Sequence, residues 1–565
     1  MTDDVECPPD GGDTPGMSDA FIQLSFGMAD AQGTRANPDG GETGDGPEPG
    51  QDAENKVCNA VAFLFDGNVT VNGEASTSVT PVFFPSVTES TEAGGTGIDA
   101  VWKTAPVQTT VENGDYNVIV VANPGDNRWW EQAGNQTLGA VRDHIQQEAW
   151  TETNGDYTNF LMSSADEPTE KLTINNNSEN EPAKVTVNVE RMAARVDYLA
   201  QNEYTCTDPA YNGATVEITG ATIVNRLTAG SYLLKRVADD VNGTNPEYLG
   251  NETAENTVAT NYVLDPWTKL KTQQNLEDEV FEVNGQNVAA AGLYDAETYI
   301  PTRSDNPENW ADYCKAGVAA TAGEGYLRVG YALENTTGKL ETSLNYNTGI
   351  VFKAQFHPVG VDDYSDGQTF FTHNGVIYPM LTDMMGQLNG QEDFSTYVGK
   401  KIAALTSWDE LKNFAASITN DPTGYRTYLE EYADTHSTET FNTANELKWE
   451  YYLNNVLGVV EDSQNGPEIN QNGINTRNVL FENSGEKLRT YYNGQCYYIW
   501  WLRHSNDGDE DTNGVMEYAV VRNNIYKVRV NSIYSLGGDI PDNQQLDAQV
   551  YVNKWSMLDR ETLPM

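Results

Sequence analysis

The chain has 565 residues, a length typical of three or four domains, or of two large domains that carry insertions. Its 84 Asp and Glu residues outnumber its 33 Lys and Arg residues, which gives a net charge of −51. A surface of this charge repels nucleic acid and anionic lipid, so we exclude nucleic-acid binding and electrostatic membrane association. The sequence also has no run of 18 apolar residues that could cross a membrane as a helix.

The first 35 residues predict a tether followed by one strand. The chain opens with MTDDVECPPDGGDTPG, an acidic segment rich in Pro and Gly, and we expect a processed residue at or just before Met1. The stretch FIQLSFGM alternates apolar and small or polar residues, which predicts a half-buried strand. Its predicted inward face consists of Ile22, Leu24, Phe26 and Met28.

The next segment predicts an unfolded linker with one basic residue. From Ala36 to Asn55 the residues are almost all Gly, Pro, Asp, Glu and Asn, with too little apolar surface to offset the entropy of ordering them. Arg35 is the only Lys or Arg in the first 55 residues. Because proteolytic nicking concentrates in exposed loops, we predict that a trypsin-like protease cuts between Arg35 and Ala36. The alternative is an ordinary surface arginine.

Most of the remaining chain predicts β-strands. Short segments rich in Val, Ile, Tyr and Phe are separated by turn residues, as in VCNAVAFLFD, YNVIVVAN, GIVFKAQFHP and NIYKVRVNSI. This pattern of short strands and turns is typical of antiparallel sandwiches. Helical periodicity occurs at 137–150 and from 400 to about 458, where Ser407 and Glu410 fit a capping box.

The predicted fold is all-β with helical insertions, in two antiparallel β-sandwich domains. A turn-rich break at 202–213 suggests the boundary between them. The predicted organisation is a leader at 1–35, an N-terminal sandwich at 36–205, a larger sandwich at 206–539 with the helical insertion around 400–458, and a terminal strand segment at 540–565.

No motif predicts catalysis or a cofactor. The nucleophile-elbow, zinc-protease, P-loop and dinucleotide patterns are absent, so we expect no enzyme and no catalytic residue. The acidic stretch 506–514 fails the EF-hand pattern, and we expect no metal site. The tryptophan pairs at 129–130 and 500–501 could stack on sugars, although burial in a core is the commoner use. The cysteines predict small buried residues or at most one disulfide; they are Cys7, Cys58, Cys206, Cys314 and Cys496.

The last strand shows the same alternation as the first. In QLDAQVYVNKW the predicted inward face consists of Leu546, Ala548, Val550 and Val552. Trp555 continues apolar on the opposite face, which indicates a bulge or a second short strand. Gln549 also lies on that opposite face, where we expect substitutions to be tolerated.

These two strands suggest a polymer. If a cut after Arg35 releases strand 21–28, a hydrophobic groove opens, and the C-terminal strand of a second molecule could fill it by strand addition. Such a contact does not close on itself, so it generates a filament. In the uncut monomer we expect the C-terminal strand to have no groove of its own, so that it is needed for assembly and not for folding.

Six motifs support this interpretation, and they keep one order along nearly the whole chain: YNVIVVANPG, FLMSSA, VNVERMAARV, YALENT, VVRNNIYKVRVNSI and QVYVNKW. Together they resemble the fimbrillin family of the type V fimbriae of Bacteroidia, which includes the major and minor fimbrium subunits. The VVRNN segment is the most specific of the six. Among the members, the sequence is most similar to shaft subunits of the minor fimbrium.

The resemblance implies two transthyretin-like sandwiches that polymerise by donor-strand exchange, after an Arg-specific protease removes the first strand. It implies export through the outer membrane as a lipoprotein precursor, lipidated near Met1 or at Cys7, and a place in a cell-surface fimbrium that serves adhesion or biofilm formation. The implied partners are copies of the chain, anchor and tip subunits, the protease, and host or bacterial surface ligands.

Three alternatives remain open. The chain could be the tip adhesin of such a fimbria, which is expected to lack a free donor strand. It could be the anchor, which is expected to lack efficient cleavage. A monomeric glycan-binding surface lipoprotein would share the tether and the β texture, but would have no need for a spare C-terminal strand.

Overall fold

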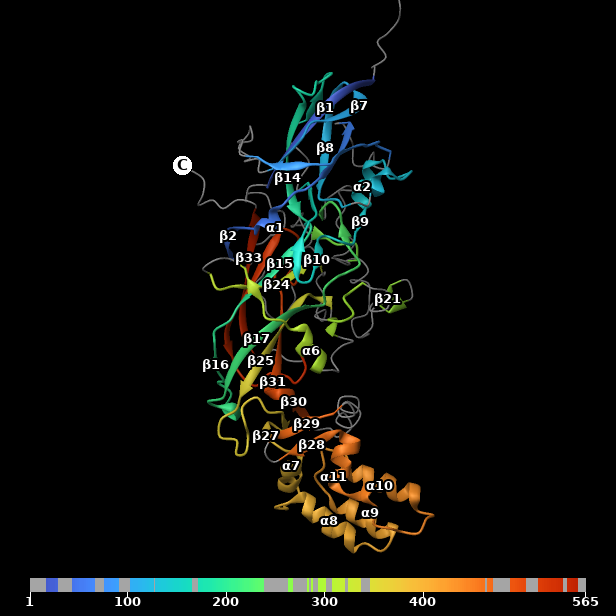
Figure 1. The fold of residues 1–565 in the computed structure, drawn as a ribbon, viewed down its shortest axis with the longest axis vertical. Helices are drawn as coiled ribbons and strands as arrows, with labels where there is room; N and C mark the ends of the chain where they lie inside the picture. Colours follow the sequence, from blue (N-terminus) through green and yellow to red (C-terminus); the bar gives the residue numbers. More distant parts are fainter. Residues whose placement is uncertain are drawn as a thin grey trace, which may run out of the picture.

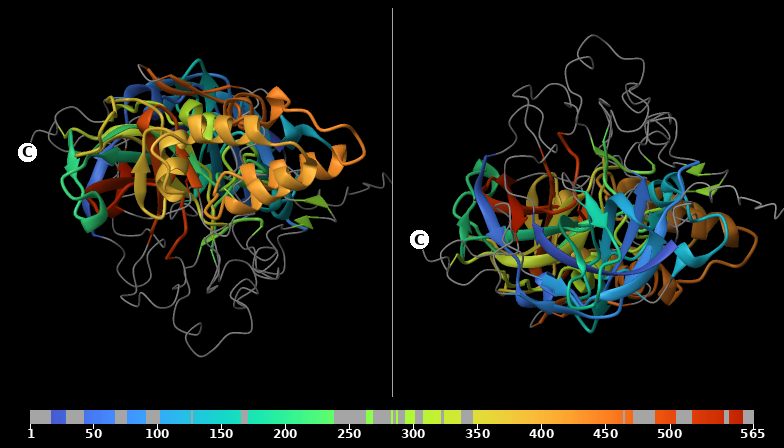
Figure 2. Two further views of the ribbon diagram at one scale, coloured as in Figure 1. Left: turned by 90° about the horizontal axis from the view of Figure 1, so that it is seen from below. Right: turned by 90° about the horizontal axis from the view of Figure 1, so that it is seen from above.

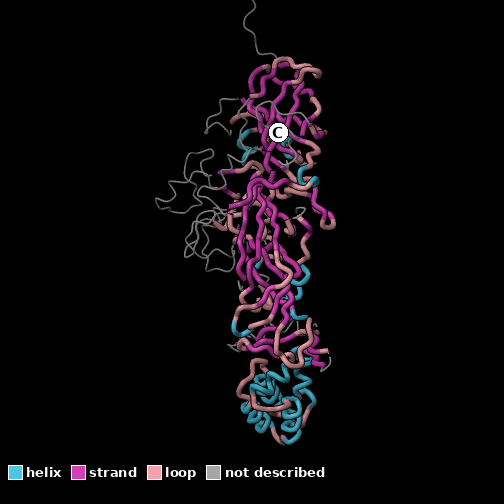
Figure 3. Tube along the Cα trace, turned by 90° about the vertical axis from the view of Figure 1, so that its left-hand side faces the viewer, coloured by secondary structure: helices cyan, strands magenta, loops and turns pink. Residues whose placement is uncertain are grey.

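The protein is an elongated molecule with three parts. A large N-terminal sheet forms one end, a two-sheet sandwich forms the middle, and a group of helices forms the other end (Figures 1 and 3). The computed structural model describes residues 17–28, 43–66, 76–90, 102–125, 128–164, 171–237, 263–267, 282–283, 286–287, 293–300, 307–320, 324–336, 346–462, 465–470, 488–504, 517–541 and 546–556. Within these ranges, no helix has the length and apolar character needed to cross a bilayer.

The N-terminal sheet has ten strands and curls around one core. Its order is β4-β3-β8-β12-β14-β1-β6-β5, with β7 beside β1 and β13 beside β8. Val82 of β4 and Val111 of β7 belong to the same core cluster as Phe26 of β1, which requires the sheet to fold back on itself. The strands are β1 (Met17–Met28), β3 (Ala60–Asp66), β4 (Thr80–Phe84), β5 (Val87–Glu89), β6 (Trp102–Thr104), β7 (Val107–Glu112), β8 (Gly114–Ala122), β12 (Met162–Ser164), β13 (Leu172–Ile174) and β14 (Ala183–Arg191).

The outer face of this sheet is covered as well. Strand β3 is apolar at every position except its last, because its alternate residues enter two different cores. The outer core contains Trp129 and Trp130 of η1 (Trp129–Glu131), which are 6% and 2% exposed, together with α2 (Leu138–Asp143). This tryptophan pair is therefore core rather than a platform for sugars. Helix α2 is shorter than the 137–150 segment predicted from the sequence.

The middle of the molecule is a sandwich of a six-stranded sheet and a four-stranded sheet. The first has the order β2-β33-β32-β15-β24-β23 and the second β16-β17-β25-β31. Their facing side chains form one core cluster that includes Val196, Val528, Phe352 and Tyr498. The strands are β2 (Thr43–Pro49), β15 (Ala194–Leu199), β16 (Tyr204–Thr205), β17 (Thr215–Val224), β23 (Val318–Ala319), β24 (Leu327–Ala332), β25 (Gly349–His357), β31 (Gln495–Trp501), β32 (Asn524–Ile533) and β33 (Leu546–Ser556).

The helical group lies beyond the sandwich and has its own apolar core. It contains α7 (Leu381–Leu388), α8 (Phe394–Ala404), α9 (Trp408–Ser417), α10 (Tyr425–His436), η6 (Asn445–Leu447), α11 (Trp449–Tyr452) and the π-turn η7 (Leu453–Leu457). The predicted cap of α9 is present, since Ser407 Oγ accepts from the Glu410 amide at 3.2 Å. The group begins at Leu381, about twenty residues before the start near 400 that we predicted.

Short elements complete the chain. They are α1 (Asp52–Asn55), η2 (Pro209–Tyr211), α6 (Pro307–Tyr313), η9 (Tyr492–Gly494), β9 (Ile145–Gln146), β10 (Thr151–Thr153), β11 (Asp156–Thr158), β18 (Ser231–Tyr232), β19 (Arg236–Val237), β20 (Val263–Leu264), β21 (Glu282–Val283), β22 (Gln286–Asn287), β26 (Phe370–His373), β27 (Val376–Tyr378), β28 (Val459–Asp462), β29 (Gly466–Ile469) and β30 (Leu488–Tyr491). Figure 2 shows the two ends of the molecule, with the helices at one end and the curled sheet at the other.

The fold class predicted from the sequence, all-β with a helical insertion, is confirmed. The sheets are not purely antiparallel, however, because three strand pairs run parallel: β1 with β14, β15 with β32, and β2 with β33. The chain passes between the two parts at Met192 and Ala193, before the break at 202–213, because β15 already belongs to the middle sheet. Neither Gly nor Pro marks this crossing, since the segment VNVERMAARVDYLA contains neither residue.

The structure describes four of the five cysteines but not the acidic stretch. Cys58, Cys206, Cys314 and Cys496 are free thiols, and three of them are buried. Cys7 and the segment 506–514 lie outside the described residues. In the part of the chain that is described, no group of three or more His, Cys, Asp or Glu side chains could hold a metal ion.

Candidate functional site: the first strand, the last strand and their junction

The first strand is an interior strand of the N-terminal sheet. Residues Ile22–Met28 of β1 pair parallel with Ala183–Val189 of β14. On its other side, residues Met17–Ile22 pair antiparallel with β7, and Ser25 and Phe26 pair with β6. Removing β1 would therefore leave unpaired backbone along both flanking edges of a long slot.

The inward face of β1 agrees with the prediction. Ala20, Ile22, Leu24 and Phe26 have no exposed surface. Met28 ends the strand, and its side chain lies outside the described part. Burying the three large side chains contributes, as an upper estimate, roughly 4–9 kcal/mol at about 1.5–3 kcal/mol each. The slot beneath β1 is thus an apolar groove whose filling stabilises the whole N-terminal sheet.

One polar contact on the other face fixes the position of β1 along the slot. The flanking ladder is interrupted between β6 and β7 at residues 105–106, where Pro106 lacks an amide N–H. At this gap Gln23 Nε2 donates to the Thr104 carbonyl at 2.9 Å, and the Leu24 amide donates to Thr104 Oγ1 at 3.0 Å. Both Gln23 and Thr104 are buried. The alternation pattern placed Gln23 on this face, but it gave no sign that the amide is buried and bonded.

The predicted cleavage site is not located by the structure. Strand β1 ends at Met28 and β2 begins at Thr43. Arg35 and Ala36 lie between them, outside the described residues. The cut between them stays a prediction.

The last strand occupies a groove in its own chain, so the expectation that it has none in the monomer is wrong. Strand β33 lies between β32, to which it pairs antiparallel, and β2. The side chains of Leu546, Ala548 and Val550 are buried in the core of the middle sandwich, and Val552 is half-buried against it. An alternating strand fits its own sandwich as well as a neighbour's, and the sequence pattern could not distinguish the two.

Trp555 extends the last strand into the N-terminal core. Its ring stacks on Tyr331 with centroids 5.7 Å apart and meets Phe160 edge-on at 5.7 Å. The Arg191 guanidinium lies 4.4 Å from the ring centroid. Trp555 is completely buried and belongs to the same cluster as the inward face of β1. The first and last strands therefore share a core.

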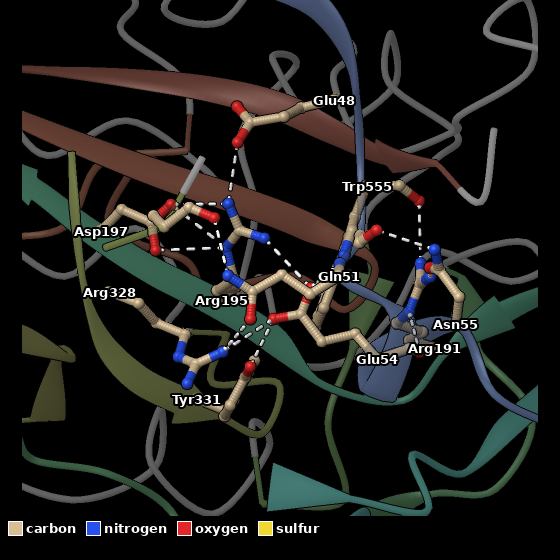
Figure 4. A network of polar contacts seen from close by, with 12 residues as sticks. Glu48, Gln51, Glu54, Asn55, Arg191, Arg195, Asp197, Arg328, Tyr331 and Trp555 are labelled. Carbon is tan, nitrogen blue, oxygen red and sulfur yellow. Dashed lines mark hydrogen bonds and ion pairs between the residues drawn. The ribbon is translucent and has the colours of Figure 1, made fainter. Parts of the chain in front are cut away.

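A buried polar cluster surrounds this junction (Figure 4). Arg195 forms ion pairs with Glu48 at 2.8 Å, Glu54 at 3.1 Å and Asp197 at 2.8 Å. Arg191 donates to the backbone carbonyls of Glu54 at 3.0 Å and Trp555 at 3.1 Å. The cluster thus ties β2 and α1, which follow the predicted cut, to β14, β15 and the end of β33.

These contacts correct the prediction that Ala36–Asn55 cannot fold. Residues 43–55 form β2 and α1, and Glu48 and Glu54 are buried. Lys527 Nζ donates to Glu48 at 2.9 Å, and Asn553 Nδ2 donates to the same carboxylate oxygen at 3.2 Å. Composition counts apolar surface only, so it missed a segment that is ordered by cations far away in the sequence.

Gly50 allows the close approach of this segment to the last strand. Its amide donates to the Ser556 carbonyl at 2.8 Å. A Cβ atom at position 50 would lie 2.7 Å from Trp555 Nε1. No larger residue fits there without displacing the indole.

Burial and charge act against each other in this cluster. Burial lowers the pKa of Arg191, although the Glu54 carboxylate opposes that shift. Burial also acts to lower the pKa of Arg195, but the attraction of Asp197, Glu54 and Glu48 outweighs it, and the net shift is upward. Both guanidinium groups remain charged. Removing Arg195 would take a charged partner from three buried carboxylates, and removing Arg191 would take a donor from the carbonyls of Glu54 and Trp555.

Residues 489–561 match the family model described as "Major fimbrial subunit protein type IV, Fimbrillin, C-terminal". The match spans β31, β32 and β33, the strands that carry the last part of the middle sandwich. The C-terminal part of this chain is therefore similar to the C-terminal segment of fimbrillins. The resemblance to fimbrillins predicted from the six motifs is thereby confirmed, and it supports a structural subunit of a cell-surface fimbrium.

No curated protein matches the chain. Several solved structures are similar over their full length. A putative cell adhesion protein from Parabacteroides distasonis is 13% identical, with 96% of this chain and 100% of that one covered and a TM-score of 0.40. A fimbrilin from Porphyromonas gingivalis is 12% identical, with 97% and 100% covered and a TM-score of 0.34. A tip fimbrial protein from the same organism is 9% identical, with 95% and 100% covered and a TM-score of 0.32. At such scores these likenesses carry no argument about function.

Proposed function

We propose that this fimbrillin-type chain polymerises into a fimbria by strand exchange triggered by proteolysis. A protease cuts after Arg35, strand β1 leaves its groove, and β33 of another copy enters. The carrying observation is that β1 is an interior strand with four fully buried side chains, joined to the rest of the chain through a linker that holds a single basic residue.

The uncut chain is protected from assembly by its own first strand. Because β1 is covalently attached, its effective concentration at the groove exceeds anything that a second molecule can supply. Cutting removes this advantage, because β1 and the neighbour's β33 then both bind the groove as separate molecules. The uncut protein is therefore monomeric under this proposal.

Strand β33 must leave its own sandwich before it can serve as a donor. Under the proposal, β33 exchanges the core of its own chain for the groove of a neighbour, so apolar burial is replaced rather than gained. We also propose export as a lipoprotein precursor, assembly with anchor and tip subunits, and a role in adhesion or biofilm formation, all on the fimbrillin match alone.

Brief trypsin treatment followed by N-terminal sequencing tests the trigger. We expect a chain that starts at Ala36, and we expect Arg35→Ala to resist the cut. Lys56→Ala is the matched control, because Lys56 is the next basic residue and should not be the first site. Prior cleavage elsewhere in the folded chain would refute the trigger.

One observation favours a second candidate, a tip-type subunit that accepts a strand and donates none. Strand β33 is held in its own sheet and at the junction. A labelled peptide of residues 545–556 separates the two candidates. A subunit of the shaft binds the peptide after cutting and also forms filaments alone, whereas a tip-type subunit binds the peptide and stays monomeric.

A further inference from the structure

We infer a register for the incoming strand, in which Gln549 of one copy takes the place of Gln23 and bonds Thr104 of the next. This inference rests on the proposed strand exchange and names the residue that sets its specificity. It differs from the expectation that changes at Gln549 are tolerated.

The groove has one polar requirement. Thr104 is 2% exposed, and its carbonyl accepts from Gln23 Nε2 while its hydroxyl oxygen accepts from the Leu24 amide. When β1 leaves, this carbonyl loses its side-chain donor at a buried position. A replacement strand that offers no donor there leaves a buried acceptor unsatisfied, which is costly.

The last strand carries the matching residue at the matching spacing. Gln23 stands between the buried residues Ile22 and Leu24, and Gln549 stands between the buried residues Ala548 and Val550. In its own sheet Gln549 is exposed, and its side-chain oxygen accepts from the Tyr551 hydroxyl at 2.7 Å. Gln549 therefore contributes little to the stability of its own sheet.

Aligning the two glutamines fixes the whole register. The four apolar residues of the donor then occupy the four buried positions of β1: Leu546 at Ala20, Ala548 at Ile22, Val550 at Leu24 and Val552 at Phe26. Leu546 is larger than Ala20, and Ala548 is smaller than Ile22. The added volume therefore lies next to the volume that is lost. Exchanges that conserve volume, as at this first pair, are the ones that cores tolerate best, whereas Val550 and Val552 are smaller than the Leu24 and Phe26 side chains that they replace.

Shifting the strand by two residues in either direction keeps the apolar face inward but places a charged side chain at a buried position. Advancing the strand by two residues puts Asp547 at the position of Gln23, where a carboxylate would face the Thr104 carbonyl. Moving it two residues the other way puts Lys554 at the position of Phe26, which has no exposed surface. A shift by one residue turns the apolar face outward. Of these registers, only the glutamine register places no charge at a position that the described side chains show to be buried.

Disulfide trapping reads the register directly. In β1, Leu24 pairs with Val185, Phe26 with Val187 and Ile22 with Ala183 of β14. The glutamine register therefore sets Val550 of the donor beside Val185 of the acceptor. We would prepare three double variants of the full chain, Val550→Cys with Val185→Cys, with Val187→Cys, or with Ala183→Cys, and then cut, assemble and oxidise each.

The three arms give distinct answers. Covalent oligomers only from the Val185 variant are the expected result. Trapping through Val187 or Ala183 instead, or filaments that none of the three traps, would overturn the register while leaving strand exchange intact. Cut protein that forms no filament at all in the wild type would remove the proposed function itself, and the register with it.

A second pair of variants tests the Gln549 contact. Gln549→Glu places a carboxylate against the Thr104 carbonyl, and we expect filament growth to slow by about tenfold or more, the effect of one lost buried hydrogen bond. Asp547→Asn is the control and should grow within about twofold of the wild type, while the alternative register predicts that it grows faster. Unchanged thermal unfolding of both uncut variants confirms that the fold is intact. Growth of Gln549→Glu at the wild-type rate would overturn the contact.

Discussion

The first and last strands make an instructive comparison. Each alternates apolar residues, each lies between two other strands, and each buries its inward face completely or nearly so. They differ in what else holds them. Beyond its ladders, strand β1 has two buried hydrogen bonds, both to Thr104, whereas the end of β33 is held by Trp555, Asn553 and the charged cluster around Arg191 and Arg195.

This difference separates the two steps of the proposed exchange. A single peptide cut turns β1 into a separate fragment that apolar burial, backbone ladders and the contacts to Thr104 retain. No cut helps β33, which must break buried hydrogen bonds to Arg191 and Glu48 before it can leave. We therefore expect the release of β33, and not the removal of β1, to be the unfavourable equilibrium that precedes insertion into the groove.

The largest predicted effect comes from deleting the last strand. Without residues 546–565, the middle sandwich loses Leu546, Val550 and Trp555 from its core and from the junction. Large-to-small changes in a core cost about 2–5 kcal/mol each, so the loss approaches the total stability of about 5–15 kcal/mol of a typical domain. We expect the thermal unfolding transition of that sandwich to move to a much lower temperature. Removing residues 1–35 should instead leave its unfolding transition in place, and equal effects of the two deletions would contradict the comparison.

Arg195→Met tests the charged cluster that only β33 has. The change leaves the carboxylates of Glu48, Glu54 and Asp197 buried without their common partner. Breaking a buried pair in this way costs about 3–5 kcal/mol, measured by denaturant unfolding. The control is Arg226→Met, which breaks the partly exposed pair with Asp295 and should cost below about 1 kcal/mol.

Arg195→Met also tests whether the charged cluster slows polymerisation. If the cluster holds β33, Arg195→Met should polymerise faster than the wild type after cutting, despite its lower stability. Slower or unchanged growth would mean that another step limits assembly.

Trp555→Phe should have an intermediate effect. The smaller ring keeps some of the contact with Tyr331 and Phe160 but loses part of the cation–π attraction to Arg191. We expect a loss of about 1–3 kcal/mol in the free energy of unfolding and faster release of β33. Trp408→Phe, in the helical group, is the matched control and should leave the rate of assembly unchanged.

The smallest effect is expected at the rim of the first strand. Thr110 Oγ1 donates to Asp19 at 2.9 Å, and this pair is exposed. Thr110→Ala should change stability by less than about 0.5 kcal/mol, as surface substitutions usually do. A cost well above 1 kcal/mol would show that β1 is held by more than its buried face and Gln23.

The sequence predicted the parts of this account that depend on local pattern. Alternation revealed β1, its inward face and β33, and the capping box at Ser407 located α9. It could not reveal which sheet a strand joins, because Leu546, Ala548 and Val550 satisfy any apolar groove. It also missed β2, since Glu48 and Glu54 are ordered by Arg195, a partner more than a hundred residues away in the chain.

The central claim is that removal of β1 opens the groove to a second copy. Electron microscopy before and after brief trypsin treatment, with mass spectrometry of the assembled chains, tests it most directly. We expect single molecules before the cut, and afterwards filaments whose chains begin at Ala36 and have lost residues 1–35. Filaments built from chains that keep residues 1–35 would contradict it.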